Sequence, residues 1–286
     1  MKLIRFLRDG KILQGIVIDG KVFDLSAFGA DYDEAFFASG GLAQLKAFVD
    51  ANRDKLKKED GPVELISPIA RPSKIVCVGL NYADHAKETG AIPPAEPVLF
   101  MKSTTALCGP FDHIIIPKDS KKTDWEVELV VVIGKKASYV AEQDATDYIA
   151  GYCLHNDISE REFQLERGGT WDKGKGCDTF APLGPWLVTP DEIKDVNNLK
   201  LWLKLNGKMM QNGTTANLIF KIPFLISYIS RFMTLLPGDI ISTGTPAGVG
   251  LGMNPPTYLK PGDVVELGID GLGTARQEVL AYTVKN

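Results

Sequence analysis

Short runs of apolar residues, each followed by a turn signal, open the chain. Residues 3–8 and 11–18 are rich in apolar side chains and are separated by Asp-Gly at 9–10, and a second Asp-Gly, at 19–20, precedes the apolar segment 22–25. Asp-Gly between two apolar runs is typical of the two-residue turn of a β-hairpin. The pattern therefore predicts a small antiparallel sheet at the start of the chain.

A helix and a proline-rich stretch follow this predicted sheet. Apolar positions between residues 42 and 56 recur with helical spacing, and three lysines lie near the end of that segment, where cations suit the helix dipole. Residues 61–72 contain three prolines and show no periodicity. We therefore expect a domain boundary near residue 70, with a small N-terminal α+β domain over residues 1–70 and a larger domain over residues 71–286.

The rest of the chain is rich in candidate strands, joined by loops that contain Gly, Pro, Asn and Asp. The predicted strands are 74–79, 113–116, 126–133, 151–155, 199–205, 239–243 and 263–269. Helical patterns are found at 83–88, 143–150, 160–167 and 223–233. Strands and helices do not alternate regularly, which argues against a doubly wound parallel sheet. The pattern favours a mixed, strand-dominated α+β fold.

Composition argues against several classes of protein. Hydrophobic residues make up 44% and charged residues 24% of the chain, which is ordinary globular usage. The net charge of −4 indicates no basic face for nucleic acid, and no apolar run approaches the roughly 18 residues of a membrane span. The four cysteines lie far apart without a Cys-x-x-Cys pair, which favours reduced thiols over disulfides. We expect a cytoplasmic protein that binds neither nucleic acid nor membrane.

Two glutamates occupy the start of a strongly apolar predicted strand. Glu126 and Glu128 are two residues apart, and five apolar residues follow Glu128 directly. Side chains two apart on a strand point to the same face, so both carboxylates would lie side by side at the edge of a buried sheet. Such carboxylates repel each other in a low dielectric unless they share a cation. Alternatively, the start of the strand is exposed and both glutamates are solvated.

A third carboxylate, Asp157, follows the apolar segment that ends at His155 and Asn156. Ser159 and Glu162 form a capping-box pattern, which puts Asp157 at a strand-to-helix junction. Turn formation alone would also explain an Asp at this position. Three carboxylates without an adjacent cluster of His and Cys would specify a hard, oxygen-binding ion. Mg²⁺ fits best, with Mn²⁺ or Ca²⁺ as substitutes.

A histidine and a glutamate form the candidate catalytic pair. His85 and Glu88 follow the predicted strand 74–79 and lie three residues apart in a predicted helical turn, so they share one face. A carboxylate that orients an imidazole and raises its basicity suits a general base that activates water. An ordinary surface pair is the alternative.

Two glycine-containing loops carry candidate substrate contacts. Lys175 lies among glycines in segment 171–176, where the backbone can approach a ligand and the ammonium could neutralise an enolate or a carboxylate. Residues 243–250 hold Thr245 among three glycines but lack the Lys-Ser/Thr end of a P-loop. They could form a nest for a carboxylate. A solvated lysine and simple turn chemistry are the alternatives.

Taken together, these segments resemble the fumarylacetoacetate hydrolase family. The motifs that carry the resemblance span residues 70–280 and are Gly79-Leu80-Asn81-Tyr82 with His85 and Glu88, Pro97 to Lys102, Glu126-Val127-Glu128, Asp157 to Gln164, Lys175, Asn206-Gly207, and Gly238-Asp239 to Gly250. The resemblance implies a mixed β-roll catalytic domain behind a small N-terminal domain. It also implies a homodimer or a dimer-based assembly.

The resemblance assigns a role to each candidate residue by its position. It implies metal ligands at Glu126, Glu128 and Asp157. It implies a water-activating pair at His85 and Glu88. It implies substrate contacts at Lys175, Gln164 and Thr245. Lys175 would also stabilise charge in the reaction, and Thr245 would bind the carboxylate of the substrate.

Within the family, segments 122–128 and 166–176 look most like bacterial enzymes of sugar-acid breakdown. Those enzymes hydrolyse 2,4-diketo-3-deoxy-L-fuconate or 2,4-diketo-3-deoxy-L-rhamnonate to pyruvate and L-lactate. The resemblance thus implies a metal-dependent hydrolase that cleaves a C–C bond in a small 2,4-dioxo acid. Two alternatives stay open: an oxaloacetate decarboxylase or dioxo-acid isomerase of the same fold, and a non-catalytic metal- or carboxylate-binding module.

Overall fold

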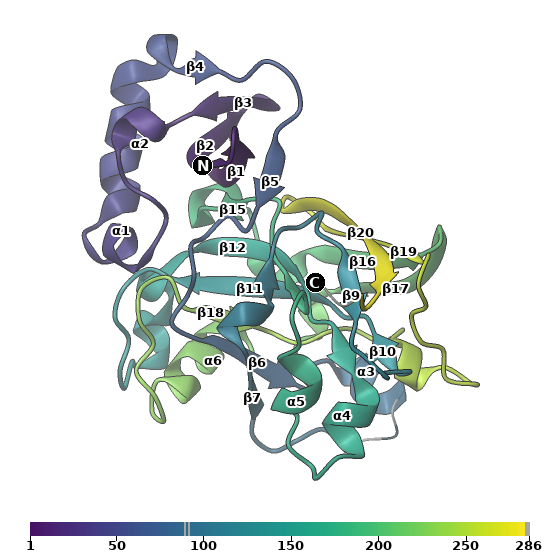
Figure 1. Ribbon diagram of the computed structural model, residues 1–286. Helices are drawn as coiled ribbons and strands as arrows, with labels where there is room; N and C mark the ends of the chain where they lie inside the picture. Colours follow the sequence, from purple (N-terminus) through teal and green to yellow (C-terminus); the bar gives the residue numbers. More distant parts are fainter. Residues whose placement is uncertain (89, 91, 284–286) are drawn as a thin grey trace.

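The structure is a computed structural model that describes residues 1–88, 90 and 92–283 (Figure 1). Within these residues, two open β-sheets of eleven and five strands carry much of the chain, and two short two-stranded pairings accompany them. Short helices connect the strands without regular alternation. This arrangement confirms the predicted mixed α+β class.

The first strands form the hairpins that the two Asp-Gly pairs predict. β1 (Lys2–Arg8) pairs antiparallel with β2 (Lys11–Ile18), which pairs antiparallel with β3 (Lys21–Asp24). Both turns have positive φ at Asp and at Gly, the conformation that a two-residue hairpin turn favours. The predicted helix is α2 (Gly41–Asn52), which follows α1 (Glu34–Ala38) and ends before the predicted end at residue 56.

The N-terminal strands belong to the same sheet as the centre of the chain. Across the large sheet the order is β4 (Lys57–Lys58), β3, β2, β1, β15 (Leu187–Val188), β12 (Ile149–Asn156), β11 (Val127–Ile133), β18 (Ile240–Ser242), β6 (Ile75–Gly79) and β7 (Val98–Lys102). β5 (Glu64–Ile66) also pairs with β1. The junction is the antiparallel pairing of β1 with β15. The division into domains near residue 70 stays a prediction.

The centre of the large sheet positions the candidate site. Its strands are β6 (Ile75–Gly79), β7 (Val98–Lys102), β11 (Val127–Ile133), β12 (Ile149–Asn156) and β18 (Ile240–Ser242). β11 is buried along its whole length and lies between β12 and β18, both antiparallel to it. β18 in turn pairs parallel with β6. The apolar run predicted as a strand is therefore the middle of the sheet.

The second sheet has the order β17-β16-β19-β20-β9. Its strands are β9 (Ile114–Ile116), β16 (Lys200–Leu205), β17 (Lys208–Thr214), β19 (Val264–Ile269) and β20 (Gly273–Ala281). The short pairings join β8 (Leu107–Cys108) to β14 (Ala181–Pro182) and β10 (Thr123–Asp124) to β13 (Ser159–Glu160). Of all these strands and those of the large sheet, β7, β17 and β20 are the long ones that the sequence pattern does not predict.

The helices are short and partly match the prediction. They include α3 (Ala83–Glu88), α4 (Arg161–Leu165), α5 (Asp172–Lys175) and α6 (Ile222–Ile229). The segment predicted as a helix at 143–150 is instead a 3₁₀ helix at Glu142–Tyr148, because Ile149 already begins β12. In the part of the chain that the structure describes, no helix has both the length and the apolar character needed to cross a membrane.

Candidate active site

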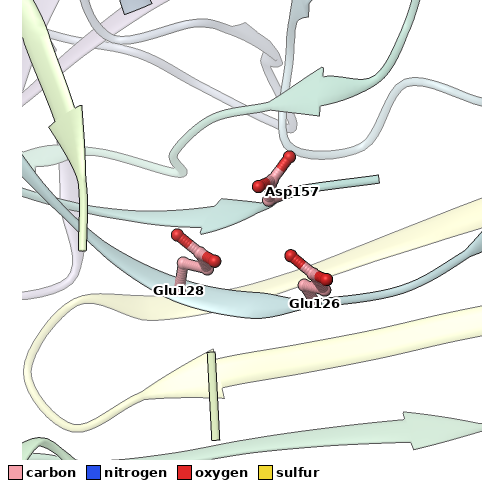
Figure 2. Close-up of side chains that lie close together, drawn as sticks. All are labelled: Glu126, Glu128 and Asp157. Carbon is pink, nitrogen blue, oxygen red and sulfur yellow. The ribbon is translucent and has the colours of Figure 1, made fainter. Parts of the chain in front are cut away.

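Three carboxylates meet where two neighbouring central strands of the large sheet begin and end (Figure 2). Glu126 immediately precedes β11, Glu128 is its second residue, and Asp157 immediately follows β12. Because β11 and β12 are antiparallel, the start of one lies beside the end of the other. Oxygen atoms of the three side chains lie within 4.8 Å of one another, and all three residues are buried. We call these three residues the acidic cluster; burial rules out the interpretation that they are merely solvated.

Cationic side chains compensate two of the three carboxylates. Lys175 Nζ lies 2.7 Å from Glu126 Oε2 and 2.8 Å from Asp157 Oδ2. Lys102, at the end of β7, places its Nζ 2.5 Å from the other oxygen of Asp157. Arg161 contacts the remaining oxygen of Glu126 at 2.7 Å. Burial alone would raise the pKa of Asp157, but Lys102 and Lys175 hold that pKa well below its usual value, so Asp157 stays ionised.

Glu128 differs from its neighbours because its hydrogen-bond donors are neutral. Its Oε2 accepts a hydrogen bond from Ser242 Oγ at 2.6 Å and one from the backbone N–H of Gly244 at 2.9 Å. Among the described residues, no cation forms an ion pair with it. Burial and the charges of Asp157 and Glu126 raise the pKa of Glu128 well above its usual value. A divalent cation would compensate the negative charge of an ionised Glu128, and the all-oxygen ligand set fits a hard ion.

The predicted catalytic pair is formed on α3, directly after β6. His85 Nδ1 lies 3.4 Å from Glu88 Oε2, and His85 is 8% exposed, which argues against an ordinary surface pair. The backbone N–H of Gly248 lies 2.9 Å from one Glu88 oxygen and 3.0 Å from the other. Burial alone would raise the pKa of Glu88, but the hydrogen bonds from His85 and Gly248 lower it below its ordinary value. Glu88 is therefore ionised and able to orient the imidazole.

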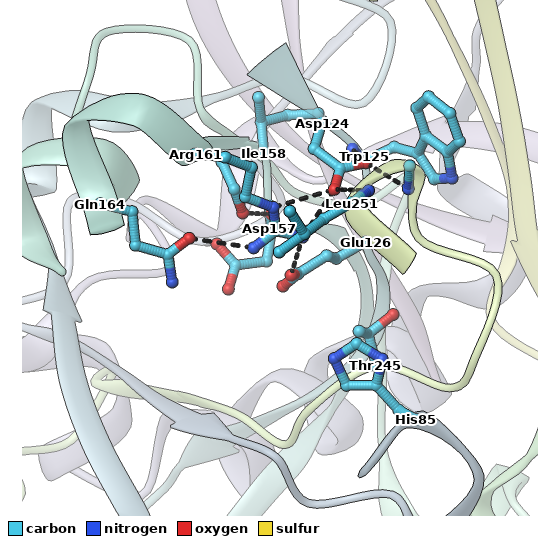
Figure 3. Close-up of polar contacts among 12 residues, drawn as sticks. His85, Asp124, Trp125, Glu126, Asp157, Ile158, Arg161, Gln164, Thr245 and Leu251 are labelled. Atoms are coloured by element: carbon cyan, nitrogen blue, oxygen red, sulfur yellow. Dashed lines mark hydrogen bonds and ion pairs between the residues drawn. The ribbon is translucent and has the colours of Figure 1, made fainter. Parts of the chain in front are cut away.

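A further carboxylate, Asp124, links the acidic cluster to the loop that holds Glu88 (Figure 3). Asp124 is fully buried and accepts hydrogen bonds from the backbone N–H groups of Gly250 at 2.7 Å and Leu251 at 3.0 Å. It also pairs with the Arg161 guanidinium at 2.8 Å. Arg161 in turn contacts the acidic cluster. A continuous chain of contacts thus joins the two halves of the site.

Three residues of this site were missed by the sequence analysis, namely Lys102, Asp124 and Arg161. A signal for Asp124 exists, because it continues the two-residue spacing of Glu126 and Glu128 toward the N-terminus. Arg161 begins α4 at the strand-to-helix junction that the sequence analysis identified through Asp157. Lys102 closes the Pro97 to Lys102 motif of the resemblance, but it lies on β7, which the apolar pattern does not predict, and no role was assigned to it.

The predicted substrate contacts lie at the site, but several of their polar atoms already have partners. Gln164 Oε1 accepts a hydrogen bond from Arg161 at 3.0 Å. Thr245 Oγ1 donates to the carbonyl oxygen of Val127 at 2.9 Å and accepts from Gln211 Nε2 at 2.8 Å. The single hydroxyl proton of Thr245 is thus used to fix the start of β11. Its role in binding a substrate carboxylate stays a prediction.

A cavity of about 220 Å³ opens beside the acidic cluster. Six of the eight predicted site residues line it, and the other two, Glu88 and Asp157, contact the lining residues His85 and Lys175, respectively. Apart from Arg161, the other lining residues are apolar or glycine. The candidate general base and two carboxylates of the acidic cluster, Glu126 and Glu128, therefore face one small cavity.

Comparison with known proteins connects this geometry to a family. Residues 74–280 match the family described as fumarylacetoacetate (FAA) hydrolase C-terminal. The chain is also 52% identical over 279 residues to a protein from Burkholderia multivorans whose name places it among the hydrolases and gives no substrate. That likeness covers 97% of this chain and 98% of the relative.

Solved structures share the fold over nearly the whole chain. Fumarylacetoacetate hydrolase from Exiguobacterium antarcticum is 33% identical with a TM-score of 0.86, and maleylpyruvate hydrolase from Sphingobium sp. SYK-6, solved with manganese(II) and pyruvate, is 31% identical with a TM-score of 0.83. A 5-carboxymethyl-2-hydroxymuconate delta-isomerase from Mycobacterium smegmatis is 32% identical with a TM-score of 0.77. Each likeness covers 99% of this chain and 100% of the other. The chain belongs to the fumarylacetoacetate hydrolase family.

Proposed function

We propose that the protein is a Mg²⁺-dependent hydrolase that cleaves a C–C bond in a small 2,4-dioxo acid and releases pyruvate. The observation that carries the proposal is one cavity lined both by Glu126 and Glu128 of the acidic cluster and by His85, whose partner Glu88 is ionised. A hard ion and a general base acting on the same small acid suit hydrolysis beside a carbonyl group. The likeness to a maleylpyruvate hydrolase solved with manganese and pyruvate supports this class of chemistry.

Glu126, Glu128 and Asp157 would hold the ion, with Mg²⁺ as the resident metal and Mn²⁺ or Ca²⁺ as substitutes. Their buried carboxylate oxygens are the ligands that these hard cations prefer. When bound, the ion would supply a Lewis acid for the carboxylate and 2-oxo end of the substrate. Lys175, whose Nζ already touches two of the three carboxylates, would add positive charge at the same end.

The hydrolytic step falls to His85. Its imidazole, oriented by Glu88, takes a proton from a water molecule, and the oxygen of that water attacks the C4 carbonyl carbon. The C3–C4 bond then breaks with its electron pair on C3, and a proton is returned to C3 to form the methyl group of pyruvate. The acyl group leaves as a second acid, so one water molecule is consumed for each bond cleaved.

The finer proposal concerns substrate and setting. We propose 2,4-diketo-3-deoxy-L-rhamnonate or 2,4-diketo-3-deoxy-L-fuconate as the substrate, with L-lactate as the second product. The support is the resemblance of segments 122–128 and 166–176 and a cavity of about 220 Å³, which suits a six-carbon acid better than a large ligand. The same proposal includes a homodimer or dimer-based assembly and a cytoplasmic location, which rest on the resemblance and the composition.

Pyruvate release from a panel of 2,4-dioxo acids, with and without EDTA, tests the proposed function. We expect one pyruvate and one second acid per substrate, measured by chromatography, and loss of both products on chelation. Activity should return when Mg²⁺ is added back. Absence of pyruvate from every member of the panel would reject the hydrolase.

An isomerase or decarboxylase of the same fold is the second candidate, favoured by the likeness to the Mycobacterium smegmatis delta-isomerase. Such an enzyme needs the acidic cluster but no attacking water. Oxaloacetate would then yield CO₂ with pyruvate, whereas an isomerisation would shift ultraviolet absorbance without any cleavage. A non-catalytic metal- or carboxylate-binding module would bind the ion and turn over none of these compounds.

A further inference from the structure

Apart from Arg161, the part of the cavity lining that lies outside the predicted site is apolar or glycine. Besides Gly79, it consists mainly of Val78, Leu80, Phe100, Leu165, Trp171 and Leu251. The two cations that line the cavity, Lys175 and Arg161, are ion-paired with carboxylates of the site. His85 is paired with Glu88. Among the described lining residues, no cation is therefore left to receive a second anionic group of a substrate.

Trp171 is fixed as part of this apolar wall. A Cβ added at Gly79 would lie 2.5 Å from Trp171 Cζ3, so the glycine leaves the space that the indole occupies. The indole packs against Phe100 with ring centroids 5.3 Å apart. Asp172, the next residue, accepts a hydrogen bond from the backbone N–H of Met101 at 2.8 Å and so ties the start of α5 to β7. The wall is a packed surface of the fold.

Cations on the neighbouring loop are engaged elsewhere. Arg167 pairs with Glu162 at 2.6 Å and lies over the Phe163 ring, 4.8 Å from its centroid. Lys173 donates to the backbone carbonyl of Arg167. Neither cation lines the cavity. The loop therefore holds its positive charge away from the apolar wall.

Charge compensation in the site sets a limit of the same kind. Lys102, Arg161 and Lys175 are each ion-paired with carboxylates of the site. A divalent ion held by the acidic cluster would receive the carboxylate and 2-oxo end of the substrate. A second carboxylate at the far end of the substrate would lie against the apolar wall without a partner, which is energetically costly.

We infer that the site selects 2,4-dioxo acids whose tail beyond C4 is short and uncharged, and that it rejects those whose tail ends in a second carboxylate. The inference rests on the proposed hydrolase function and adds to it the class of acyl group. The carboxylate end of the acid lies at the metal ion that the acidic cluster would hold, and the tail lies against the apolar wall. A methyl, propyl or hydroxyethyl tail belongs to the accepted class.

Two acids of equal chain length test this inference. 2,4-Dioxoheptanoate ends its tail in a methyl group, and 2,4-dioxoheptanedioate ends it in a carboxylate. With the metal-loaded protein, we expect kcat/KM for pyruvate release to be about 100-fold higher, or more, for the heptanoate, the range for a buried charge that lacks its partner. Equal or faster cleavage of the dioate would overturn the inference but would still support the proposed hydrolase function. If none of the three acids, the heptanoate, the dioate and 2,4-dioxopentanoate, releases pyruvate, both the proposed function and the inference are wrong.

A binding measurement separates selectivity from turnover. Calorimetry with the metal-loaded His85→Ala variant is expected to give the same order of the two acids, because exclusion of charge acts on binding. Equal affinity of this variant for both acids would contradict the inference.

A substitution in the wall tests whether missing charge, rather than shape, excludes the dioate. Leu165 lies at the rim and is 46% exposed, so Leu165→Arg can bring a guanidinium to the tail. We expect kcat/KM for the dioate to rise about fivefold over that of Leu165→Gln, the contribution of a partly exposed ion pair. Leu165→Gln controls for loss of the apolar side chain. Identical behaviour of the two variants toward the dioate would show that charge is not the cause.

Discussion

Two groups of buried charged side chains lie at opposite ends of β18, and they are built differently. At its start, Asp239 is fully buried and accepts hydrogen bonds from Ser73 Oγ at 2.7 Å and from the backbone N–H groups of Lys74 at 2.9 Å and Leu236 at 2.7 Å. Lys74 Nζ, at 2.5 Å, supplies the counter-charge. One negative charge thus meets one positive charge and three neutral donors.

At the other end of β18, Ser242 donates to Glu128, one of three carboxylates whose oxygens lie within 4.8 Å of one another. Asp239 is as deeply buried as Asp157, so burial of charge does not distinguish the two groups. The difference is that the acidic cluster holds like charges together and leaves Glu128 without a cation among the described residues. Crowded and incompletely compensated charge, rather than burial, therefore distinguishes the candidate site from the group around Asp239.

Loss of His85 is expected to lower kcat more than any of the other proposed substitutions. It would show that the reaction takes place beside the acidic cluster, at the end of β18. His85→Ala should lower kcat for pyruvate release by about 10²–10⁴-fold, the usual contribution of a general base. Metal affinity, measured by calorimetry, should be retained because the acidic cluster is untouched. A fully active variant would assign water activation to another group.

Glu128→Gln sharpens the comparison by removing the carboxylate that lacks a counter-charge. Metal affinity is expected to fall at least about 100-fold, beyond the effect of losing a group that only orients a ligand. The free energy of unfolding of the metal-free protein should not fall, because like-charge repulsion is relieved. Calorimetry and chemical denaturation measure the two quantities. Retained metal affinity would remove Glu128 from the ligand set.

Asp124→Asn tests the connection between the two halves of the site. The amide cannot pair with Arg161 as the carboxylate does, so the loop that holds Glu88 should loosen. We expect kcat to fall about tenfold, as for other groups that orient catalytic residues. Hydrogen exchange of segment 248–252 should be faster than in the wild type. Unchanged exchange together with unchanged kcat would break the proposed connection.

Asp239→Asn is the matched control, since it also alters a buried carboxylate with one cation and backbone donors. Activity per folded molecule should stay near that of the wild type. The free energy of unfolding should fall by roughly 2–3 kcal/mol, because Lys74 loses its partner in a largely buried position. A loss of activity comparable to that of Asp124→Asn would show that the comparison does not hold.

The acidic cluster could be predicted from sequence because its geometry is local. Two-residue spacing puts Glu126 and Glu128 on one face of a strand, and the end of the next apolar strand along the large sheet brings Asp157 beside them. The spacing of His85 and Glu88 within one helical turn is equally local. Periodicity and the positions of element ends were therefore enough to select the three residues of the acidic cluster and the His85–Glu88 pair as candidates.

Of the surrounding cations, Lys102 and Arg161 were not predicted, because their contacts with the acidic cluster join segments that are distant in sequence. Lys102 reaches Asp157 across 55 positions, and nothing in the pattern around either residue indicates the pairing. β20 shows the same limit for the fold. Gln277 occupies a buried position of its alternation and bonds to Asn156 and to the carbonyl of Pro110, so the apolar period of the strand is interrupted.

The cations beside the acidic cluster also bear on how the protein is made in a cell. Because Lys102, Arg161 and Lys175 already offset much of the negative charge, we expect the chain to reach its native state without a metal. Uptake of the proposed ion would then be a separate event after synthesis. The metal that is installed would reflect which free divalent ions surround the finished protein, and a stripped protein could be reloaded without refolding.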